Sequence, residues 1–565
     1  MDQERTAPLR PRLWLALGAA LMAIGVALAA VTERAGGVSV SDVRFRGPDG
    51  TMFSALVYRP KAATPQNPAP GILAVHGYIN SRETQSPFAI ELARRGYVVL
   101  ALDQRGHGFS GGAAATKGFG GPEGLSFLRR LPFVDQGRIG LEGHSMGGWA
   151  VLAAAAAGPD AYRAMVLEGS STGAPFAKEG TPAWPRNVEV VYSRFDEFAP
   201  LMWGVARAGD IGRSPKLEAL FGVAKPVRQG VIYGDIAAGR ARRLTQPFAT
   251  HPGDHLSTAA VADAADWFAL TLGAGRLPRS DQIWPLKEAG TGLALLGAGA
   301  LILGLFDALL GLKLFATLRG PPSAGGQGPR WPLAAFTAFV PALTYFALPL
   351  AAPFVRPSAL FPQAVSNQLM VWVLGNAALA LLAGAWLGER RPIGRRLGLP
   401  DWVRAGVLAA LVAGAIYALD ALAGLAAVDF RFWVVALRPF SARQAVAALS
   451  YVIPFTLFVL VAFRGAGALA RGGRGDYAWA VAALAGGFAV LTGAQYAFLF
   501  ATGALPVPAM ALNTIVAMQF VPLLAGLAIL AVHAWRRTGS FVPGALIGGL
   551  LVTWYMVAGT ATHVA

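Results

Sequence analysis

Ser145 stands between two glycines in the stretch Gly143-His144-Ser145-Met146-Gly147. A G-x-S-x-G spacing can hold a serine hydroxyl on a sharp turn, from which it attacks a carbonyl carbon. That chemistry needs an imidazole to take the serine proton and a carboxylate to orient the imidazole. Because the chain has 69 glycines among 565 residues, such a spacing also arises by chance, and the elements around the serine must decide.

The segments on both sides of Ser145 have the character that a nucleophile turn requires. Residues 138–143 (RIGLEG) are short and apolar and predict a strand that leads into the turn. Residues 147–158 (GGWAVLAAAAAG) are strong helix formers, and Gly158-Pro159 predicts where that helix ends. Glycine is needed at the turn because neighbouring side chains would collide where a strand passes abruptly into a helix.

Further apolar runs predict the strands that would surround this turn. They cover residues 71–78, 96–112, 161–171 and 187–200, and helical stretches separate them. Strands that alternate with helices at this spacing predict βαβ units and a parallel sheet.

Residues 38–272 resemble the α/β-hydrolase family. The resemblance rests on H-G-Y at 76–78, D-x-R-G-H-G-x-S at 103–110 and G-H-S-M-G-G at 143–148, followed by a strand with an aspartate and a later histidine. It implies an α/β fold with a doubly wound, mostly parallel sheet, and catalytic residues in the order serine, acid, histidine. Ser145 is then the nucleophile and Asp196 the acid, with Glu168 as the alternative acid.

Two histidines compete for the role of base. His255 lies directly before a predicted helix, where the family usually places its base. We therefore assign the base to His255 and keep His251 as the alternative base. Three other histidines, His76, His107 and His144, are expected to support the scaffold.

The same resemblance assigns the oxyanion hole to two backbone N–H groups, those of Met146 and Tyr78. No metal motif or phosphate-binding loop is found, the chain has no cysteine, and we expect no cofactor. Between Asp196 and His251, a segment of about fifty residues contains Trp203, Leu220 and Phe221. We expect these side chains to be exposed and to cap the site on a lipid-facing surface.

The rest of the chain is strongly apolar, since 55% of all residues are hydrophobic and only 14% are charged. Nine segments reach the roughly 20 residues that cross a bilayer. They are 13–31, 290–312, 331–354, 369–387, 403–427, 445–463, 477–500, 510–532 and 541–557.

These segments predict three parts. Residues 1–31 form a transmembrane anchor (or a cleaved signal peptide), residues 32–288 an extracytoplasmic α/β-hydrolase domain, and residues 289–565 a membrane domain of about eight all-α transmembrane helices. We expect a multi-pass protein of the plasma or inner membrane, in contact with membrane lipids.

The orientation follows from basic residues, which concentrate in cytoplasmic loops. Basic residues precede the first span and then recur in alternate loops, and the stretch 431–443 is a partial exception. The basic residues before the first span and in these alternate loops are Arg5, Arg10, Arg12; Lys313, Arg319, Arg330; Arg390, Arg391, Arg395, Arg396; Arg464, Arg471, Arg474; Arg536, Arg537. The net charge of +17 reflects these loops in part, so we expect no nucleic-acid partner.

Two aspartates fall inside predicted spans, where an ionisable group is costly and a functional role is a standing hypothesis. Asp420 has two interpretations that stay open, a functional role and a hydrogen bond within the helical bundle. For Asp307, a solvated position near the cytoplasmic end of its span is preferred.

The sequence therefore predicts a membrane-bound serine hydrolase that cleaves an ester, thioester or amide, from a small-molecule or lipid substrate, through an acyl-enzyme. An acyltransferase is a variant of this prediction. A membrane transport or partner-binding protein with a hydrolase-like sensor domain is the alternative, because eight spans exceed what an anchor requires. The substrate and any protein partner remain open.

Overall fold

The structure is a computed structural model, and it describes residues 11–275, 277–322, 330–348, 355–386, 394–433, 435–560 and 562–564. The chain divides into two compact units. One unit, here the hydrolase unit, consists of Leu28–Ala289, Gln495–Ala511 and Thr562–Ala565; the other, the helical unit, consists of Met1–Ala27, Gly290–Ala494 and Leu512–Ala561.

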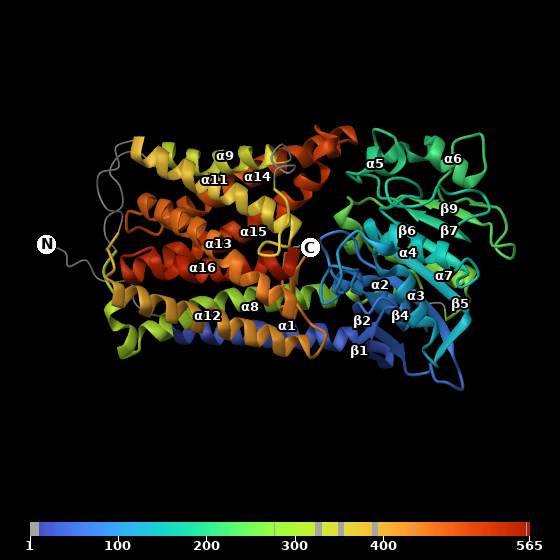
Figure 1. Cartoon of the computed structure of the whole chain (residues 1–565), viewed down its shortest axis with the longest axis horizontal. Helices are drawn as coiled ribbons and strands as arrows, with labels where there is room; N and C mark the ends of the chain where they lie inside the picture. The colour runs from blue at the N-terminus through green and yellow to red at the C-terminus, as the bar shows by residue number, and fades with distance from the viewer. Residues whose placement is uncertain are drawn as a thin grey trace. The chain divides into compact units, whose positions relative to one another are not determined.

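A nine-stranded sheet forms the centre of the hydrolase unit (Figure 1). Its middle strands are parallel to one another, and antiparallel strands stand at both ends. In spatial order the strands are β1 (Val38–Arg46), β2 (Met52–Pro60), β4 (Val98–Leu102), β3 (Ala69–Val75), β5 (Val134–His144), β6 (Ala164–Glu168), β7 (Val188–Val191), β9 (Arg242–Thr245) and β8 (Ile232–Tyr233).

Helices cover both faces of this sheet, which explains why its central strands are continuous apolar runs. On one face, Leu128 of α3 (Gly121–Arg129) packs next to Gly71 of β3, and α3 contacts α4 (Met146–Ala157). On the other face, Phe268 of α7 (Thr258–Thr271) packs over Gly140 of β5, and α7 contacts α2 (Ser86–Arg94). The predicted α/β fold with a mostly parallel sheet is confirmed.

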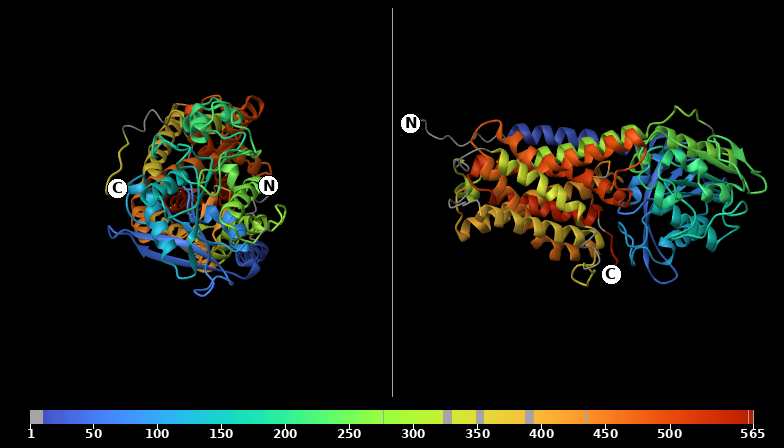
Figure 2. Two further views of the ribbon diagram at one scale, coloured as in Figure 1. Left: turned by 90° about the vertical axis from the view of Figure 1, so that its right-hand side faces the viewer. Right: turned by 90° about the horizontal axis from the view of Figure 1, so that it is seen from above.

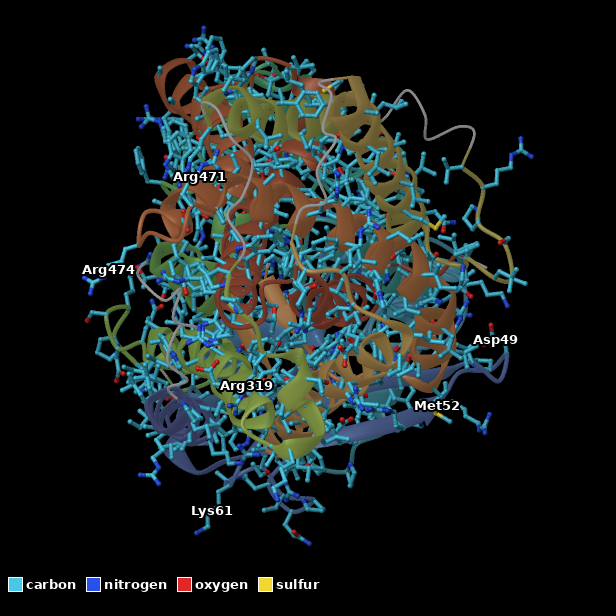
Figure 3. All side chains as sticks on the ribbon, turned by 90° about the vertical axis from the view of Figure 1, so that its left-hand side faces the viewer. Asp49, Met52, Lys61, Arg319, Arg471 and Arg474 are labelled. Carbon is cyan, nitrogen blue, oxygen red and sulfur yellow. The ribbon has the colours of Figure 1, made fainter. Side chains whose placement is uncertain are left out.

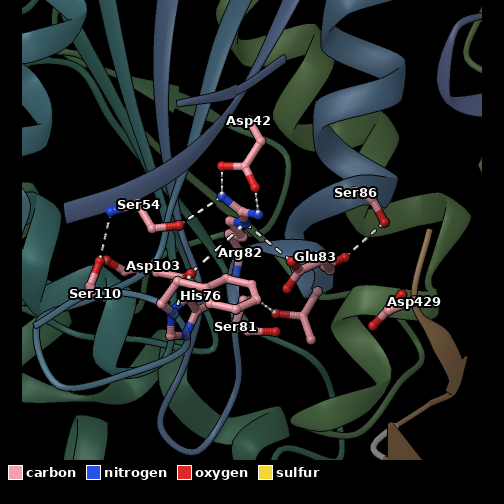
Figure 4. A network of polar contacts seen from close by, with 12 residues as sticks. Asp42, Ser54, His76, Ser81, Arg82, Glu83, Ser86, Asp103, Ser110 and Asp429 are labelled. Atoms are coloured by element: carbon pink, nitrogen blue, oxygen red, sulfur yellow. Dashed lines mark hydrogen bonds and ion pairs between the residues drawn. The ribbon is translucent and has the colours of Figure 1, made fainter. Parts of the chain in front are cut away.

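The D-x-R-G-H-G-x-S motif joins β4 to the buried guanidinium of Arg82 (Figure 4). Asp103 accepts the Arg82 backbone N–H at 2.9 Å, and Arg82 donates two hydrogen bonds, of 2.7 and 2.6 Å, to Asp42 of β1. Ser110 donates to the Asp103 carbonyl at 2.7 Å. These residues therefore hold β1, β4 and the loops beside them together.

An insertion between β7 and β9 carries α5 (Ala199–Trp203), η4 (Ala208–Arg213) and α6 (Pro215–Phe221). The expectation that Trp203, Leu220 and Phe221 are exposed is wrong, because all three are buried in the core of the hydrolase unit. Ser214 turns the segment back on itself, since its hydroxyl donates to the Trp203 carbonyl and accepts the Leu217 N–H.

The helical unit consists of long helices that run side by side (Figures 1 and 2). Among the described residues, eight helices are long and apolar enough to cross a membrane, which suggests a membrane protein. The long helices are α1 (Pro11–Glu33), α8 (Trp284–Leu310), α11 (Ala364–Trp386), α12 (Leu399–Gly424), α13 (Ala442–Leu469), α14 (Asp476–Thr502), α15 (Ala511–Thr538) and α16 (Val542–Trp554).

The remaining predicted span, 331–354, is described only as far as residue 348, where α9 (Trp331–Phe346) is a shorter apolar helix. Residues 349–354 lie outside the described part of the chain.

The loops predicted to be cytoplasmic meet at one end of the helical unit. Gly320 donates to the Arg537 carbonyl at 3.1 Å, and Arg395 donates to the Gly539 carbonyl at 2.7 Å. Arg330 pairs with Asp476 at 3.1 Å, beside the loop that carries Arg471 and Arg474. Figure 3 shows Arg319, Arg471 and Arg474 on this end.

Candidate active site

Ser145 lies on a sharp turn between the end of β5 and the start of α4. Its backbone has φ 54° and ψ −121°, a conformation that non-glycine residues rarely adopt. A Cβ on Gly143 would lie 2.3 Å from the Gly147 carbonyl oxygen, and one on Gly147 would lie 2.0 Å from the Val75 carbonyl oxygen. Both glycines of the motif are therefore required by close backbone contact, and Ser145 itself stays partly exposed.

Two hydrogen bonds hold this turn against the end of the next strand. The Ser145 N–H donates to the Glu168 carbonyl at 2.8 Å, and the Ser170 hydroxyl donates to the Ser145 carbonyl at 2.7 Å. The serine is thus fixed at the carboxyl end of β5, beside the end of β6.

Asp196 follows β7 and is paired with His251. The Asp196 Oδ2 atom is 2.7 Å from His251 Nδ1, and both side chains are buried. The other carboxylate oxygen, Oδ1, accepts the Phe198 N–H at 2.7 Å and the Tyr192 hydroxyl at 3.1 Å. The carboxylate is therefore fixed in orientation, with one oxygen reserved for the imidazole.

The imidazole of His251 lies beside the serine turn. A Cβ on Gly169, the residue after Glu168, would lie 2.9 Å from His251 Nδ1. Gly169 also has φ 50°, so both space and backbone favour glycine there. His144 Nε2 lies 2.9 Å from the His251 carbonyl oxygen, so the residue before the serine also contacts the loop that carries His251.

The preference for His255 over His251 is not supported by this geometry, since the structure brings His251 to Asp196. His255 instead stacks against His144, with ring centroids 4.0 Å apart. The reason is the 3₁₀ turn Pro252–Leu256, which begins directly after His251. Because a 3₁₀ helix has three residues per turn, a side chain four positions on points about a third of a turn away.

Charge favours a basic His251. Burial lowers the pKa of a histidine, but the charge and hydrogen bond of Asp196, with the charge of Glu197, outweigh it and raise the pKa of His251 above its ordinary value. An imidazole with a raised pKa is a better proton acceptor in its neutral form.

Glu168, the alternative acid, is buried at the end of β6, near the buried Glu142 of β5. Burial raises the pKa of both carboxyl groups, and their mutual repulsion raises that of Glu168 further. A group held neutral in this way is poorly suited to stabilise an imidazolium, so the geometry favours Asp196.

The two backbone groups assigned to the oxyanion hole lie next to the serine. Met146 is the first residue of α4, so its N–H has no acceptor within the helix. Tyr78 follows Gly77, and a Cβ on Gly77 would lie 3.2 Å from the Ser145 Cβ. The turn at 76–78 therefore passes directly against the nucleophile.

The three histidines expected to support the scaffold, His76, His107 and His144, are buried. His76 Nδ1 lies 2.7 Å from the Gly77 carbonyl oxygen, and its Nε2 accepts the Gln104 N–H at 3.1 Å. Burial lowers the pKa of His107 to about 4, so this imidazole is neutral.

Glu197, the residue after Asp196, also contacts the base, and nothing in the sequence indicates this contact. Its Oε2 atom accepts the His251 backbone N–H at 2.7 Å, and its Oε1 atom accepts the hydroxyl of Tyr496 at 2.6 Å. Tyr496 is 299 positions away in the sequence, and no local pattern links the two residues.

In the helical unit, Asp420 of α12 is fully buried, and its functional role stays a prediction. Asp307 is also buried, which contradicts the preferred solvated position. It lies 2.9 Å from His533 Nε2 and accepts a hydrogen bond of 3.0 Å from Arg537. An ion-paired aspartate of this kind needs no solvent.

Comparisons with known proteins agree with this fold. Residues 66–200 match the family model described as serine aminopeptidase, S33. A search of the curated proteins finds no match to this chain.

Similar solved structures include three from microorganisms. An esterase of Pyrococcus furiosus is 16% identical, with coverage of 42% of this chain and 95% of that one and a TM-score of 0.30. A hyperthermophilic esterase of Pyrobaculum calidifontis is 17% identical, with coverage of 47% and 100% and a TM-score of 0.30. A hypothetical protein of Pseudomonas aeruginosa is 28% identical, with coverage of 23% and 43% and a TM-score of 0.22, so this chain spans less than half of that protein's length.

The assignment of the fold therefore rests on the family model together with the sheet and the serine turn described above. The unit that holds this sheet and turn has the α/β-hydrolase fold, and its residues 66–200 match that serine aminopeptidase family model.

Proposed function

We propose that this protein is a membrane-bound serine hydrolase that cleaves an ester, thioester or amide through an acyl-enzyme. The observation that carries the proposal is the 2.7 Å contact between Asp196 Oδ2 and His251 Nδ1, made beside the strained turn of Ser145. Ser145 is the nucleophile, His251 the general base and Asp196 the orienting acid.

In the first half of the reaction, neutral His251 takes the proton of the Ser145 hydroxyl as its oxygen attacks the substrate carbonyl carbon. The carbonyl oxygen gains a negative charge, which the N–H groups of Met146 and Tyr78 stabilise. His251 then returns its proton to the leaving alcohol, thiol or amine, and an acyl ester remains on Ser145.

In the second half, a water molecule gives a proton to His251 and attacks the acyl carbon. The bond to Ser145 breaks, the serine oxygen recovers the proton from His251, and a carboxylic acid leaves. Asp196 holds Nδ1–H throughout, so that Nε2 is the nitrogen that exchanges protons.

An apolar acyl group suits this site best. The ring of Phe198 packs edge to face on His251, with centroids 4.6 Å apart, and Tyr78 lies in the turn after β3 that passes against Ser145. Apolar walls of this kind favour acyl chains over charged substrates.

We further propose that the hydrolase unit faces the extracytoplasmic side. The basic residues at 319, 330, 395, 471–474 and 536–537 lie at one end of the helical unit, which supports a cytoplasmic location for that end. Helix α1 packs closely along α8, because a Cβ on Gly25 would lie 2.5 Å from the Gly290 carbonyl oxygen. This packing favours a retained anchor over a cleaved signal peptide.

The order of the helices supports a single side of the membrane for the hydrolase unit. If α1, α8, α9 and α11–α16 each cross the membrane once, residues 34–283, 503–510 and 562–564 fall on one side. Residues 495–511 and 562–565 belong to the hydrolase unit together with 28–289, which agrees with this count.

The test measures turnover of chromogenic esters of increasing acyl length by the full-length protein in lipid. Ser145→Ala and His251→Ala are expected to lose activity by several orders of magnitude, and His255→Ala to keep most of it, with equal membrane insertion. An active Ser145→Ala variant would overturn the proposal, and an active His251→Ala variant with an inactive His255→Ala would return the base to His255.

A further inference from the structure

The end of helix α14 is part of the hydrolase unit. The helix spans Asp476–Thr502, and residues from Gln495 onward belong to the same compact unit as the parallel sheet. Two aromatic residues of this segment contact the loop that carries Asp196. Tyr496 donates its hydroxyl to Glu197 Oε1 at 2.6 Å, and the Phe500 ring packs edge to face on Phe195, with centroids 5.1 Å apart.

These contacts grip the residues directly before and after the acid. Phe195 and Glu197 flank Asp196 in the sequence, and both are buried. Phe195 also donates its backbone N–H to the Ala249 carbonyl at 3.0 Å, two residues before His251. The loop of the acid and the loop of the base are therefore tied to each other and to the end of α14.

Glu197 is the central link. One carboxylate oxygen accepts from Tyr496 and the other accepts the backbone N–H of His251 at 2.7 Å. A buried carboxylate keeps its place only when its oxygens are hydrogen-bonded, so removal of either donor loosens the link.

The charge of Glu197 depends on the same contacts. Burial, with the charge of Asp196, raises the pKa of Glu197 to about 7, while the hydrogen bond from Tyr496 acts in the opposite direction. The charge of Glu197 in turn helps to raise the pKa of His251. The charged or titratable groups around His251 are Asp196, Glu197, Asp254, His144 and His255.

We propose that Glu197 and Tyr496 are positioning residues for the base His251, and that the end of helix α14 thereby contributes to the activity of the hydrolase unit. The inference rests on the proposed function. Tyr496 secures Glu197, and Glu197 holds the backbone of His251 so that its imidazole meets both Asp196 and Ser145. Loss of the tyrosine hydroxyl leaves the carboxylate with one donor fewer and lowers the rate.

The direct test is Tyr496→Phe in the full-length protein in lipid, which removes one hydroxyl and keeps the ring. We expect kcat to fall about tenfold, the scale of one hydrogen bond to a charged group, with KM unchanged. We also expect the acid limb of the kcat/KM profile to move to lower pH, because loss of the Tyr496 bond favours neutral Glu197 and a less basic His251. Tyr477→Phe, at the other end of the same helix, is the matched control and is expected to behave as the wild type.

Glu197 variants separate position from charge. The amide of Glu197→Gln can accept from His251 N–H and donate to the Tyr496 oxygen, so it should keep the plateau kcat and move only the acid limb to lower pH. Glu197→Ala should lower the plateau, and adding Tyr496→Phe to it should cause no further loss.

Ser145→Ala, measured beside these variants, separates the two proposals. If it is inactive while Tyr496→Phe keeps wild-type kcat and pH profile, or adds fully to Glu197→Ala, the positioning role is overturned and the hydrolase function stands. If Ser145→Ala is active, both proposals are overturned.

Discussion

The substitution Asp196→Asn tests the pairing of acid and base with almost no change in shape. Asp196 Oδ1 lies 2.7 Å from the Phe198 N–H and 3.1 Å from the Tyr192 hydroxyl, so an asparagine must turn its carbonyl oxygen toward these donors. Its NH₂ group then faces His251 Nδ1, where Asp196 Oδ2 now lies at 2.7 Å. The amide donates to Nδ1, which moves the imidazole proton to Nε2, the nitrogen that must accept the serine proton.

The opposite orientation of the amide is also unfavourable. It would place two N–H donors against each other in a buried site, at a cost of about 1–3 kcal/mol. With the wrong tautomer dominant, we expect kcat to fall by about 10⁴, which corresponds to about 5.4 kcal/mol in activation free energy.

The assay is ester hydrolysis by purified full-length protein, with Glu168→Gln as the matched control. Glu168 is equally buried, and its raised pKa makes a glutamine a close neutral substitute, so this control should keep near wild-type activity. A less than tenfold loss in Asp196→Asn, together with a severe loss in Glu168→Gln, would refute the reasoning and move the acid to Glu168.

Three further predictions concern the turn, the titration of the base and the scaffold. Gly147→Ala should abolish activity, because the added Cβ would lie 2.0 Å from the Val75 carbonyl oxygen. Gly209→Ala is the control and should have wild-type activity, because the atom nearest to its added Cβ is 3.9 Å away. Equal hydrolysis rates of the two variants would refute the close contact at Gly147. The kcat/KM value should rise with pH through a pKa above the ordinary value of about 6.5 for histidine, because only neutral His251 accepts a proton. Asp196→Asn should lower that pKa. A wild-type profile that does not rise in this way would contradict the assignment of His251 as the base. Arg82→Ala should destabilise the hydrolase unit by about 3–5 kcal/mol, because it leaves buried carboxylates without their cation. Arg44→Ala, at an exposed site, is the control and should leave Tm unchanged. Equal melting temperatures of the two variants would show that the Arg82 network does not stabilise the fold.

The fold was accessible from the sequence because its signals are local. The runs at 71–78 and 96–102 are apolar without alternation, as buried parallel strands require, and they became β3 and β4. The serine turn was equally readable, because the glycines at 143 and 147 are required by contacts within the motif and with the adjacent β3 strand.

The choice between His251 and His255 was not accessible in this way. It depends on the 3₁₀ turn Pro252–Leu256, which rotates His255 away from Asp196, and both histidines fit the spacing equally well. The insertion between β7 and β9 shows a similar limit. Trp203 and Phe221 look like a surface cap in the sequence, but they pack into the core once the segment folds back at Ser214.

The contact between Tyr496 and Glu197 lies beyond any local signal. The two residues are 299 positions apart, and within α14 the tyrosine resembles any aromatic residue near the end of an apolar helix. Only the three-dimensional structure brings it into the hydrolase unit.

The most direct test of the central claim is covalent labelling of the full-length protein in membranes with a fluorophosphonate, followed by mass spectrometry of its peptides. A hydrolase with Ser145 as its activated nucleophile is expected to carry the adduct on the peptide that contains residues 143–148, with labelling lost in His251→Ala and retained in His255→Ala. A chain that stays unlabelled, or that carries the adduct on another serine, would contradict the claim that Ser145, His251 and Asp196 form the catalytic centre.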